Sequence, residues 1–200
     1  MTDPDVFVRA RTLIDAVHAL DPELDQDAPA ELRYADRVED WLIRLHPDAD
    51  PLLRLAARCQ HLERWAVPRA SFPQDRAGYL RWRTSLYHRQ ADRARALLIE
   101  AGVSVEAADQ ARAWIAKTDL RGNSGSQALE DAACLVFLEF ELADFAAGKA
   151  HDEAYSEAKW LDIIRKTWRK MSSAAQTAAL TIPLAEPLRA LVVKAVSTPG

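Results

Sequence analysis

The sequence is poor in cysteine and glycine and has no long hydrophobic run. Two cysteines among 200 residues do not form the disulfide framework of a small secreted protein. The longest uncharged apolar run, residues 132–138, is far shorter than the roughly 20 residues that span a bilayer. The first residues also lack the basic and apolar segments of a secretion signal. We therefore expect a soluble, cytoplasmic protein with no membrane partner.

Familiar catalytic motifs are absent as well. The chain contains no CxxC, HExxH or GxSxG pattern. Gly122 and Gly125 precede a predicted helix, but the Lys-Ser/Thr pair of a phosphate-binding P-loop does not follow them. No motif of this kind identifies a reaction.

Apolar residues recur at helical spacing nearly throughout, and no segment alternates with the period of a strand. Asp3-Pro4 and Asp50-Pro51 each place an acidic N-cap before a proline, and Gly102 is suited to end a helix. The sequence predicts an all-α fold, a single compact multi-helix domain over residues 1–200 with main loops at 21–30 and 118–126. The expected helices lie at about 4–20, 31–45, 52–65, 75–101, 104–117, 127–147, 153–170 and 184–196.

Charge is distributed unevenly along the chain. Residues 1–50 contain thirteen acidic side chains and five arginines, whereas residues 54–95 contain ten arginines and three acidic side chains. This asymmetry predicts an anionic partner for the middle segment. The alternative is that the high arginine content is only compositional.

The helix expected at 127–147 is apolar on nearly every side, yet its apolar stripes carry Asp131 and Glu139. A buried ionised carboxylate costs several kcal/mol unless it is paired or bound to a metal. The two carboxylates are therefore candidate catalytic residues in a cleft that also holds Arg or His. A salt bridge to one of the arginines is the structural alternative.

The helix expected at 52–65 supplies partners for these carboxylates. His61 shares a face with Arg54, Arg58, Arg64 and Trp65 by i+3 and i+4 spacing, and neighbouring arginines disfavour its protonation. A neutral imidazole suits a metal ligand or a general base, so His61 is the central candidate. A surface histidine with no such role is the plain alternative.

The helix expected at 75–101 carries Arg76, Tyr79 and Arg83. Arginine beside an aromatic ring suits stacking on a base or binding a phosphate, although the aromatic residues can equally form the core face. His88 lies on a largely solvated stripe of the same helix and is a weaker candidate metal ligand.

Several segments of the chain together form a specific set of motifs. They are Tyr34-Ala-Asp-Arg-Val38, Ala56-Ala-Arg-Cys-Gln-His-Leu-Glu-Arg-Trp65, Pro68-Arg69, Arg76-Ala-Gly-Tyr-Leu-Arg-Trp-Arg83, Leu129-Glu-Asp-Ala-Ala-Cys-Leu-Val-Phe-Leu-Glu139 and Ile164-Arg-Lys-Thr-Trp-Arg-Lys-Met-Ser172. With these segments the chain resembles, over about residues 5–195, the uncharacterised family called domain of unknown function 4202. The resemblance implies membership of that family more firmly than it implies an activity.

The layout is also similar to that of the HD-domain metal-dependent phosphohydrolases, which are all-helical. Tyr34 stands where their first histidine would be, Gln60-His61 replaces their His-Asp pair, and Asp131 takes the place of their last aspartate. With these replacements, the resemblance implies one divalent transition metal ion or none. Its ligands would be His61 and Asp131, with Glu139 or His88, and His61 and Asp131 would meet in one cleft.

Three functions remain open. The first is an HD-like hydrolase of a phosphorylated small molecule or nucleotide, in which His61 and Asp131 hold a metal ion or activate water. The second is a metal-free module that binds a nucleotide or RNA. The third is an interaction protein whose acidic and basic parts neutralise each other. The candidate ligand-binding residues are Arg58, Gln60, Arg64, Trp65, Arg69, Arg76, Tyr79, Arg83 and Glu130.

Overall fold

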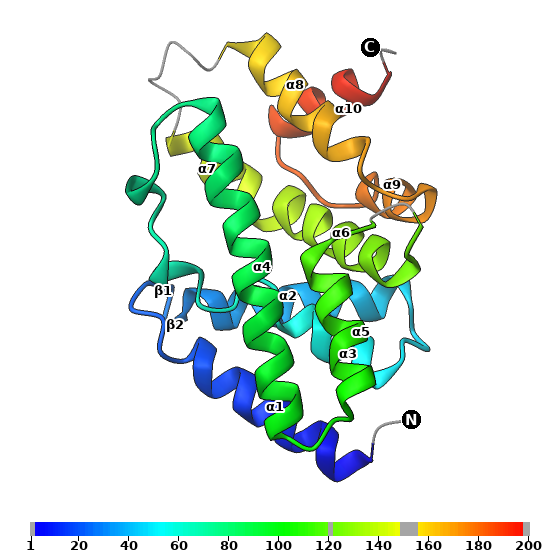
Figure 1. Ribbon diagram of the computed structural model, residues 1–200. Coiled ribbons are helices and arrows are strands. Elements are labelled where there is room, and N and C mark those ends of the chain that lie inside the picture. The colour runs from blue at the N-terminus through cyan, green and yellow to red at the C-terminus, as the bar shows by residue number, and fades with distance from the viewer. Residues whose placement is uncertain (1–2, 120–121, 149–155, 198–200) are drawn as a thin grey trace. The chain divides into compact units, whose positions relative to one another are not determined.

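The computed structural model describes residues 3–119, 122–148 and 156–197, and these are helical almost throughout (Figure 1). The all-α fold class is therefore as predicted. The chain divides into two compact units, Met1–Leu129 and Glu130–Gly200. No helix in the described ranges is long and apolar enough to cross a membrane.

The helices of the first unit begin where the sequence predicts. Helix α1 (Pro4–His18) starts at Asp3, whose carboxylate accepts from the N–H of Asp5, and α3 (Pro51–Arg58) starts at Asp50, which accepts from Leu52. These side chains satisfy N–H groups that have no partner within the helix. Helix α2 (Ala30–Leu45) stops before His46-Pro47, because the residue before proline avoids the α conformation.

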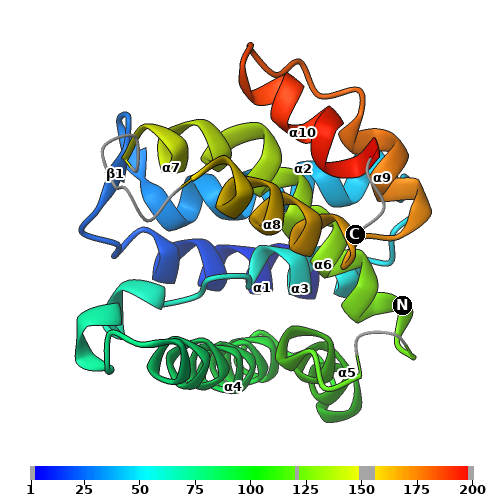
Figure 2. The same cartoon turned by 90° about the horizontal axis from the view of Figure 1, so that it is seen from above.

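Three layers of helices form the first unit (Figure 2). Helices α4 (Arg76–Glu100) and α5 (Val105–Ala116) lie side by side as one layer, α1 and α3 form the next, and α2 lies beyond them. Gly102 connects α4 to α5 with a φ of +97°, which glycine adopts without strain. The side chains at the centre of this core are fully buried and include Leu42, Leu55, Leu62, Leu98 and Ile115.

Two expectations for the first unit are wrong. The region expected as a loop at 21–30 contains a short antiparallel pair, β1 (Leu24–Asp25) with β2 (Ala28–Pro29). The helix expected to reach Trp65 ends at Arg58, and 3-10 turns η1 (Arg64–Ala66) and η2 (Arg69–Ser71) follow. His61 and Glu63 have φ values of 61° and 53°, and a right-handed helix cannot pass through left-handed residues.

The helix expected at 127–147 begins earlier and is interrupted. Helix α6 (Ser124–Val136) starts inside the expected loop at 118–126, because the side chain of Asn123 accepts from the N–H groups of Gly125 and Ser126. A π-helical turn, η3 (Phe137–Glu141), then separates α6 from α7 (Leu142–Gly148). The boundary between the two units lies within α6.

The rest of the second unit consists of α8 (Glu157–Trp168), α9 (Ser173–Ala179) and α10 (Leu188–Ser197). Helices α8 and α10 pack together, and Arg165 donates a hydrogen bond to the carbonyl of Ala195 at 3.2 Å. No helix was expected from the sequence between residues 170 and 184, where α9 lies. The first residues of the helix expected at 153–170 and residues 120–121 of the expected loop lie outside the described ranges.

Candidate functional site

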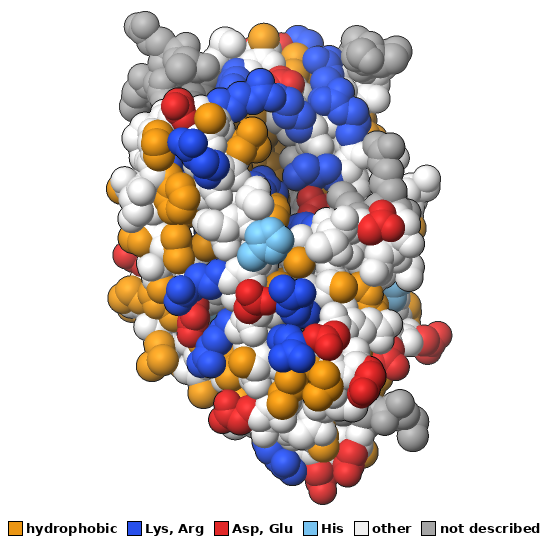
Figure 3. Space-filling model, viewed as in Figure 1, with side chains coloured by type: hydrophobic (Ala, Val, Ile, Leu, Met, Phe, Trp, Pro, Cys, Tyr) orange, Lys and Arg blue, Asp and Glu red, His pale blue; other side chains and the backbone are white. Residues whose placement is uncertain are grey.

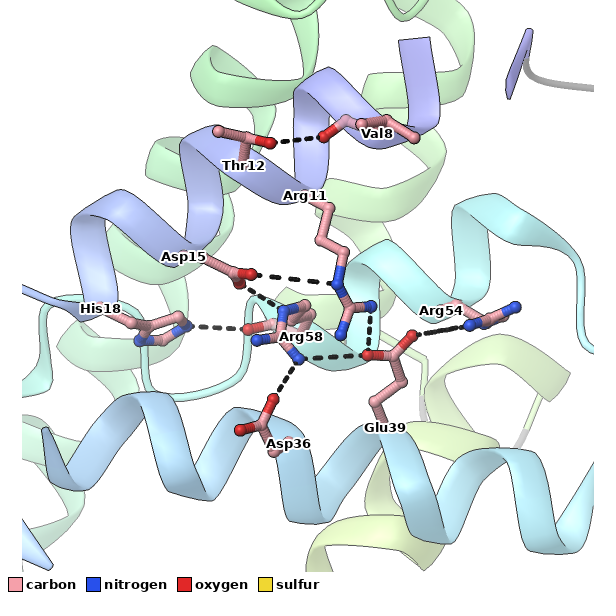
Figure 4. A network of polar contacts seen from close by, with 9 residues as sticks. All are labelled: Val8, Arg11, Thr12, Asp15, His18, Asp36, Glu39, Arg54 and Arg58. Carbon is pink, nitrogen blue, oxygen red and sulfur yellow. Dashed lines mark hydrogen bonds and ion pairs between the residues drawn. The ribbon is translucent and has the colours of Figure 1, made fainter. Parts of the chain in front are cut away.

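A buried ionic network joins α1, α2 and α3 (Figure 4). The side chain of Arg58 is only 2% exposed and donates to Asp36 at 2.7 Å, to Glu39 at 3.1 Å and to Asp15. Arg11 and Arg54 also bond to Glu39, at 2.5 and 3.1 Å. The guanidinium of Arg58 therefore holds three helices together, and we remove it from the candidate ligand-binding set.

Further arginines of the middle segment pair with acids on the surface. Arg95 bonds to Asp109 at 2.5 Å, and Asp92 of the same segment pairs with Arg112 of α5 at 2.6 Å. Both pairs link α4 to α5. Acidic and basic side chains are accordingly interspersed over these two helices (Figure 3). Glu63 binds both Arg89 and Arg93. Part of the uneven charge along the sequence is thus balanced within the fold.

His61 lies at the centre of a different polar cluster, in the turn that follows α3. Its ring stacks on Tyr34 of α2, with centroids 3.9 Å apart and planes inclined by 6°. Nδ1 of His61 is 3.2 Å from a carboxylate oxygen of Glu31, and Nε2 is 2.8 Å from a guanidinium nitrogen of Arg64. The same guanidinium nitrogen of Arg64 is 3.2 Å from Nδ1, so Arg64 of η1 contacts both ring nitrogens and Glu31 of α2 contacts one of them.

Burial and charge give this cluster unusual proton affinities. Burial, aided by the cations Arg64, Lys117 and Arg83, holds the pKa of His61 well below 6.5, so the imidazole is neutral at pH 7. The neutral state expected beside arginines is confirmed, although burial is the larger cause. Burial also raises the pKa of Glu31 to about 7, against the opposing effect of Arg64. Such values at one contact are typical of proton-transfer sites.

The nearby cation Arg83 is held by tyrosines of the same helix, α4. Its guanidinium donates to the hydroxyl of Tyr79 at 3.1 Å and to the hydroxyl of Tyr87. The ammonium of Lys117, at the end of α5, lies 5.0 Å from the ring centre of Tyr87. Arg64 lies over the ring of Trp82 at 5.3 Å, and Trp82 is part of the core face. This side of the site is rich in positive charge.

Two buried polar atoms beside the site have no hydrogen-bond partner within the described ranges: Nδ1 of His18 and Nε2 of Gln60. The other ring nitrogen of His18 lies 2.8 Å from the carbonyl of Arg58, which requires a donor, so Nδ1 is the unprotonated nitrogen (Figure 4). Burial lowers the pKa of His18 and keeps its ring neutral.

The remaining candidates of the first unit lie at its surface or support the chain. Arg69 donates to the carbonyls of Phe72 and Pro73, at 3.0 and 2.7 Å, and thereby braces the connection between α3 and α4. Arg76 and His88 are exposed on α4, and Trp65 is half-buried. Within the described ranges, no hydrogen bond, ion pair or ring contact joins these three side chains to His61, so their sequence-based roles stay predictions.

The candidates on α6 belong to the second unit. Asp131 is buried and accepts from the N–H of Ser172 at 2.8 Å, and Glu130 pairs with Lys170 at 3.1 Å. The N–H of Ser172, at the start of α9, therefore partners the carboxylate of Asp131. Glu139 is half-buried. Because His61 and Asp131 lie in different units, their common cleft stays a prediction.

A metal centre was the other expectation from the sequence. Among the described residues, no group of three or more His, Cys, Asp or Glu side chains is arranged to hold a metal ion. The metal ion expected from the sequence therefore stays a prediction.

A separate hollow of about 740 Å³ lies in the first unit, between the α2–α3 loop, α5 and the start of α6. Its lining includes Leu53, Gln110 and Trp114, and none of the candidate site residues. The sequence analysis did not predict it.

Sequence reasoning missed Glu31, His18, Tyr87 and Lys117. In the sequence, Glu31 looks like an ordinary acidic residue in the first turn of a helix. Only the packing of the folded chain brings it to His61. Tyr87 could have been found, because it follows Arg83 by four residues on the same helix.

Comparison with known proteins gives one family. No curated protein and no solved structure matches the chain. Residues 8–192, nearly the whole chain, match the profile of a family described as domain of unknown function (DUF4202). The quoted motif segments all lie within these residues. The chain therefore belongs to the DUF4202 family.

Proposed function

We propose that this protein hydrolyses a phosphorylated small molecule or nucleotide at the cluster around His61. The observation that carries the proposal is the contact of a neutral His61 with the carboxylate of Glu31 through Nδ1 and with the guanidinium of Arg64 through both ring nitrogens. Phosphoester hydrolysis requires a neutral general base, an acid that titrates near neutral pH and adjacent cations that bind the phosphoryl oxygens.

The arrangement suggests a role for each side chain. Arg64 turns from Nε2 of His61 to the phosphoryl oxygens when the ligand binds, which frees Nε2 to accept a proton from water. The resulting hydroxide attacks phosphorus, the phosphoester bond breaks, and the imidazolium returns the proton to the leaving oxygen. In the molecules in which Glu31 is ionised, its carboxylate orients the ring through Nδ1 and stabilises the transient charge of the imidazolium.

One divalent transition metal ion remains a further prediction, with His61, Asp131 and His88 as its candidate ligands. Elemental analysis of protein purified without chelator or histidine tag tests it. Near-stoichiometric metal that is lost in His61→Ala supports the prediction, whereas metal-free wild-type protein contradicts it.

Phosphate release tests the hydrolase. The substrates are p-nitrophenyl phosphate and nucleoside mono-, di- and triphosphates, assayed with and without added divalent metal. We expect His61→Gln to lower turnover by at least about a hundredfold, whereas the exposed His46→Gln leaves it unchanged. Equal turnover in His61→Gln, or no turnover of any substrate, would overturn the proposal.

A binding module without catalysis is the second candidate. Tyr79 is 40% exposed beside Arg83, which favours a nucleotide or a short RNA whose base stacks on the ring. Binding of a nucleotide without turnover, at an affinity that falls in Tyr79→Leu, is the result that would favour this candidate over the hydrolase.

A further inference from the structure

The cluster of Tyr79, Arg83 and Tyr87 on α4 contains hydrogen-bond donors in excess of acceptors. Arg83 donates to both phenol oxygens. Each hydroxyl therefore uses a lone pair on Arg83 and keeps its own hydrogen to donate elsewhere. Within the described ranges, no carboxylate pairs with this guanidinium. No acceptor among the described residues takes the hydrogen of either hydroxyl, so two O–H groups and a cation are available to an anion.

The same cluster acts on the site of His61 from a second direction. Arg83 and Lys117 both lower the pKa of His61, as does Arg64, which touches its ring. Arg64 comes from η1, whereas Arg83 comes from α4 and Lys117 from the end of α5. Arg64 also lies over the ring of Trp82 at 5.3 Å, and the ring centres of Trp82 and Tyr79 are 6.0 Å apart. A chain of contacts therefore links His61, through Arg64 and Trp82, to the cluster around Arg83.

We propose that the Tyr79–Arg83–Tyr87 cluster is a second anion subsite, and that the ligand carries two linked phosphoryl groups, as a nucleoside diphosphate or another pyrophosphate ester does. Arg64 takes the phosphoryl group next to His61, and Arg83 with the two phenols takes the other. This inference rests on the proposed function, because it names the substrate class of that site. A single phosphate would leave one of the two positions empty.

The chemistry of the cluster favours a phosphoryl group over a carboxylate. A phosphoryl group offers several oxygens in three directions, which suits donors from two phenols and one guanidinium. Tyrosine hydroxyls are neutral, so the positive charge of Arg83 remains available to the ligand. A carboxylate partner, such as the Asp109 that pairs with Arg95, would neutralise that charge.

Calorimetric titration of the full chain with inorganic phosphate and with pyrophosphate, without added metal, tests the subsite. We expect pyrophosphate to bind at least about tenfold more tightly than phosphate. The double variant Tyr79→Phe/Tyr87→Phe, which keeps both rings and Arg83, should remove that preference and leave phosphate affinity within about twofold. Arg83→Gln should act in the same way, and Arg81→Gln, an exposed arginine of the same helix, should change neither affinity.

Equal affinity for the two anions, or an unchanged pyrophosphate preference in the double variant, would overturn this inference. The two proposals fail separately. Tight pyrophosphate binding without turnover of any phosphoester supports the subsite and overturns the hydrolase. Turnover of monoesters with no pyrophosphate preference supports the hydrolase and overturns the subsite.

Discussion

A carboxylate oxygen of Glu31 lies 3.2 Å from Nδ1 of His61, although the two residues are 30 positions apart. Their side chains are only 15% and 24% exposed. Helix α2 supplies the acid in its first turn, and the left-handed turn after α3 supplies the imidazole. Burial raises the pKa of Glu31 to about 7 and holds that of His61 well below 6.5, so the group of this pair that titrates near neutral pH is the acid.

The raised pKa of Glu31 predicts a pH-dependent stability. A carboxyl whose pKa rises from 4.5 to about 7 on folding favours the folded state below pH 4.5, and this contribution is lost as pH rises through 7. We expect the free energy of unfolding of Glu31→Gln, relative to wild type, to increase by about 3 kcal/mol between pH 4.5 and 8. Urea denaturation across this range measures it, and a pH-independent difference would contradict the raised pKa.

We expect replacement of Arg58 to lower the free energy of unfolding more than any other substitution in the first unit. Arg58→Met leaves the buried Glu39 and two further carboxylates without their shared partner. We expect the free energy of unfolding to fall by about 3 kcal/mol. Arg112→Met breaks only an exposed pair and should cost far less. Equal losses in guanidinium denaturation would show that the network is not structural.

Gly125 is needed where α6 approaches α5. A Cβ at this position would lie 2.4 Å from two atoms of the Trp114 indole. Gly125→Ala should therefore lower the free energy of unfolding by about 1–3 kcal/mol. Gly148→Ala is the control, because no atom lies within 4 Å of its Cβ position. A thermal melt in which both variants match wild type would contradict the close packing.

Asp131→Asn separates a structural from a chemical role of Asp131. The asparagine keeps an oxygen that can accept from the N–H of Ser172, so stability should fall less than in Asp131→Ala. If Asp131 serves the reaction at His61, turnover should drop by at least about a hundredfold while the fold is retained. Full turnover in a stable Asp131→Asn would leave the residue a purely structural role.

Local signals in the sequence predicted most helix starts. Asp3 and Asp50 accept the hydrogen bonds expected of N-caps, and Gly102 follows the end of α4. These features depend on a few neighbouring residues, so periodicity and capping rules suffice. The same rules gave the wrong end of α3, because nothing in residues 59–63 marks His61 and Glu63 as left-handed.

The candidate site was predicted only in part. His61 and Arg64 were found together because they are three residues apart, and their contact is confirmed although they do not share a helix. Glu31 could not be found, since its approach to His61 depends on how α2 packs against α3. The sequence predicts a ligand-binding role for Arg58 because it does not show its carboxylate partners, which lie 19 to 43 residues away along the chain.

Proton uptake on anion binding tests the central account most directly. A phosphoryl group bound at Arg64 would raise the pKa of the adjacent Glu31 further, so that this side chain takes up a proton. Titration of pyrophosphate into the protein at pH 7.5, in buffers of different ionisation enthalpy, measures that uptake. We predict uptake of about half a proton per wild-type molecule and none in Glu31→Gln. Binding without proton uptake in wild type, or the same uptake in Glu31→Gln, would contradict the account.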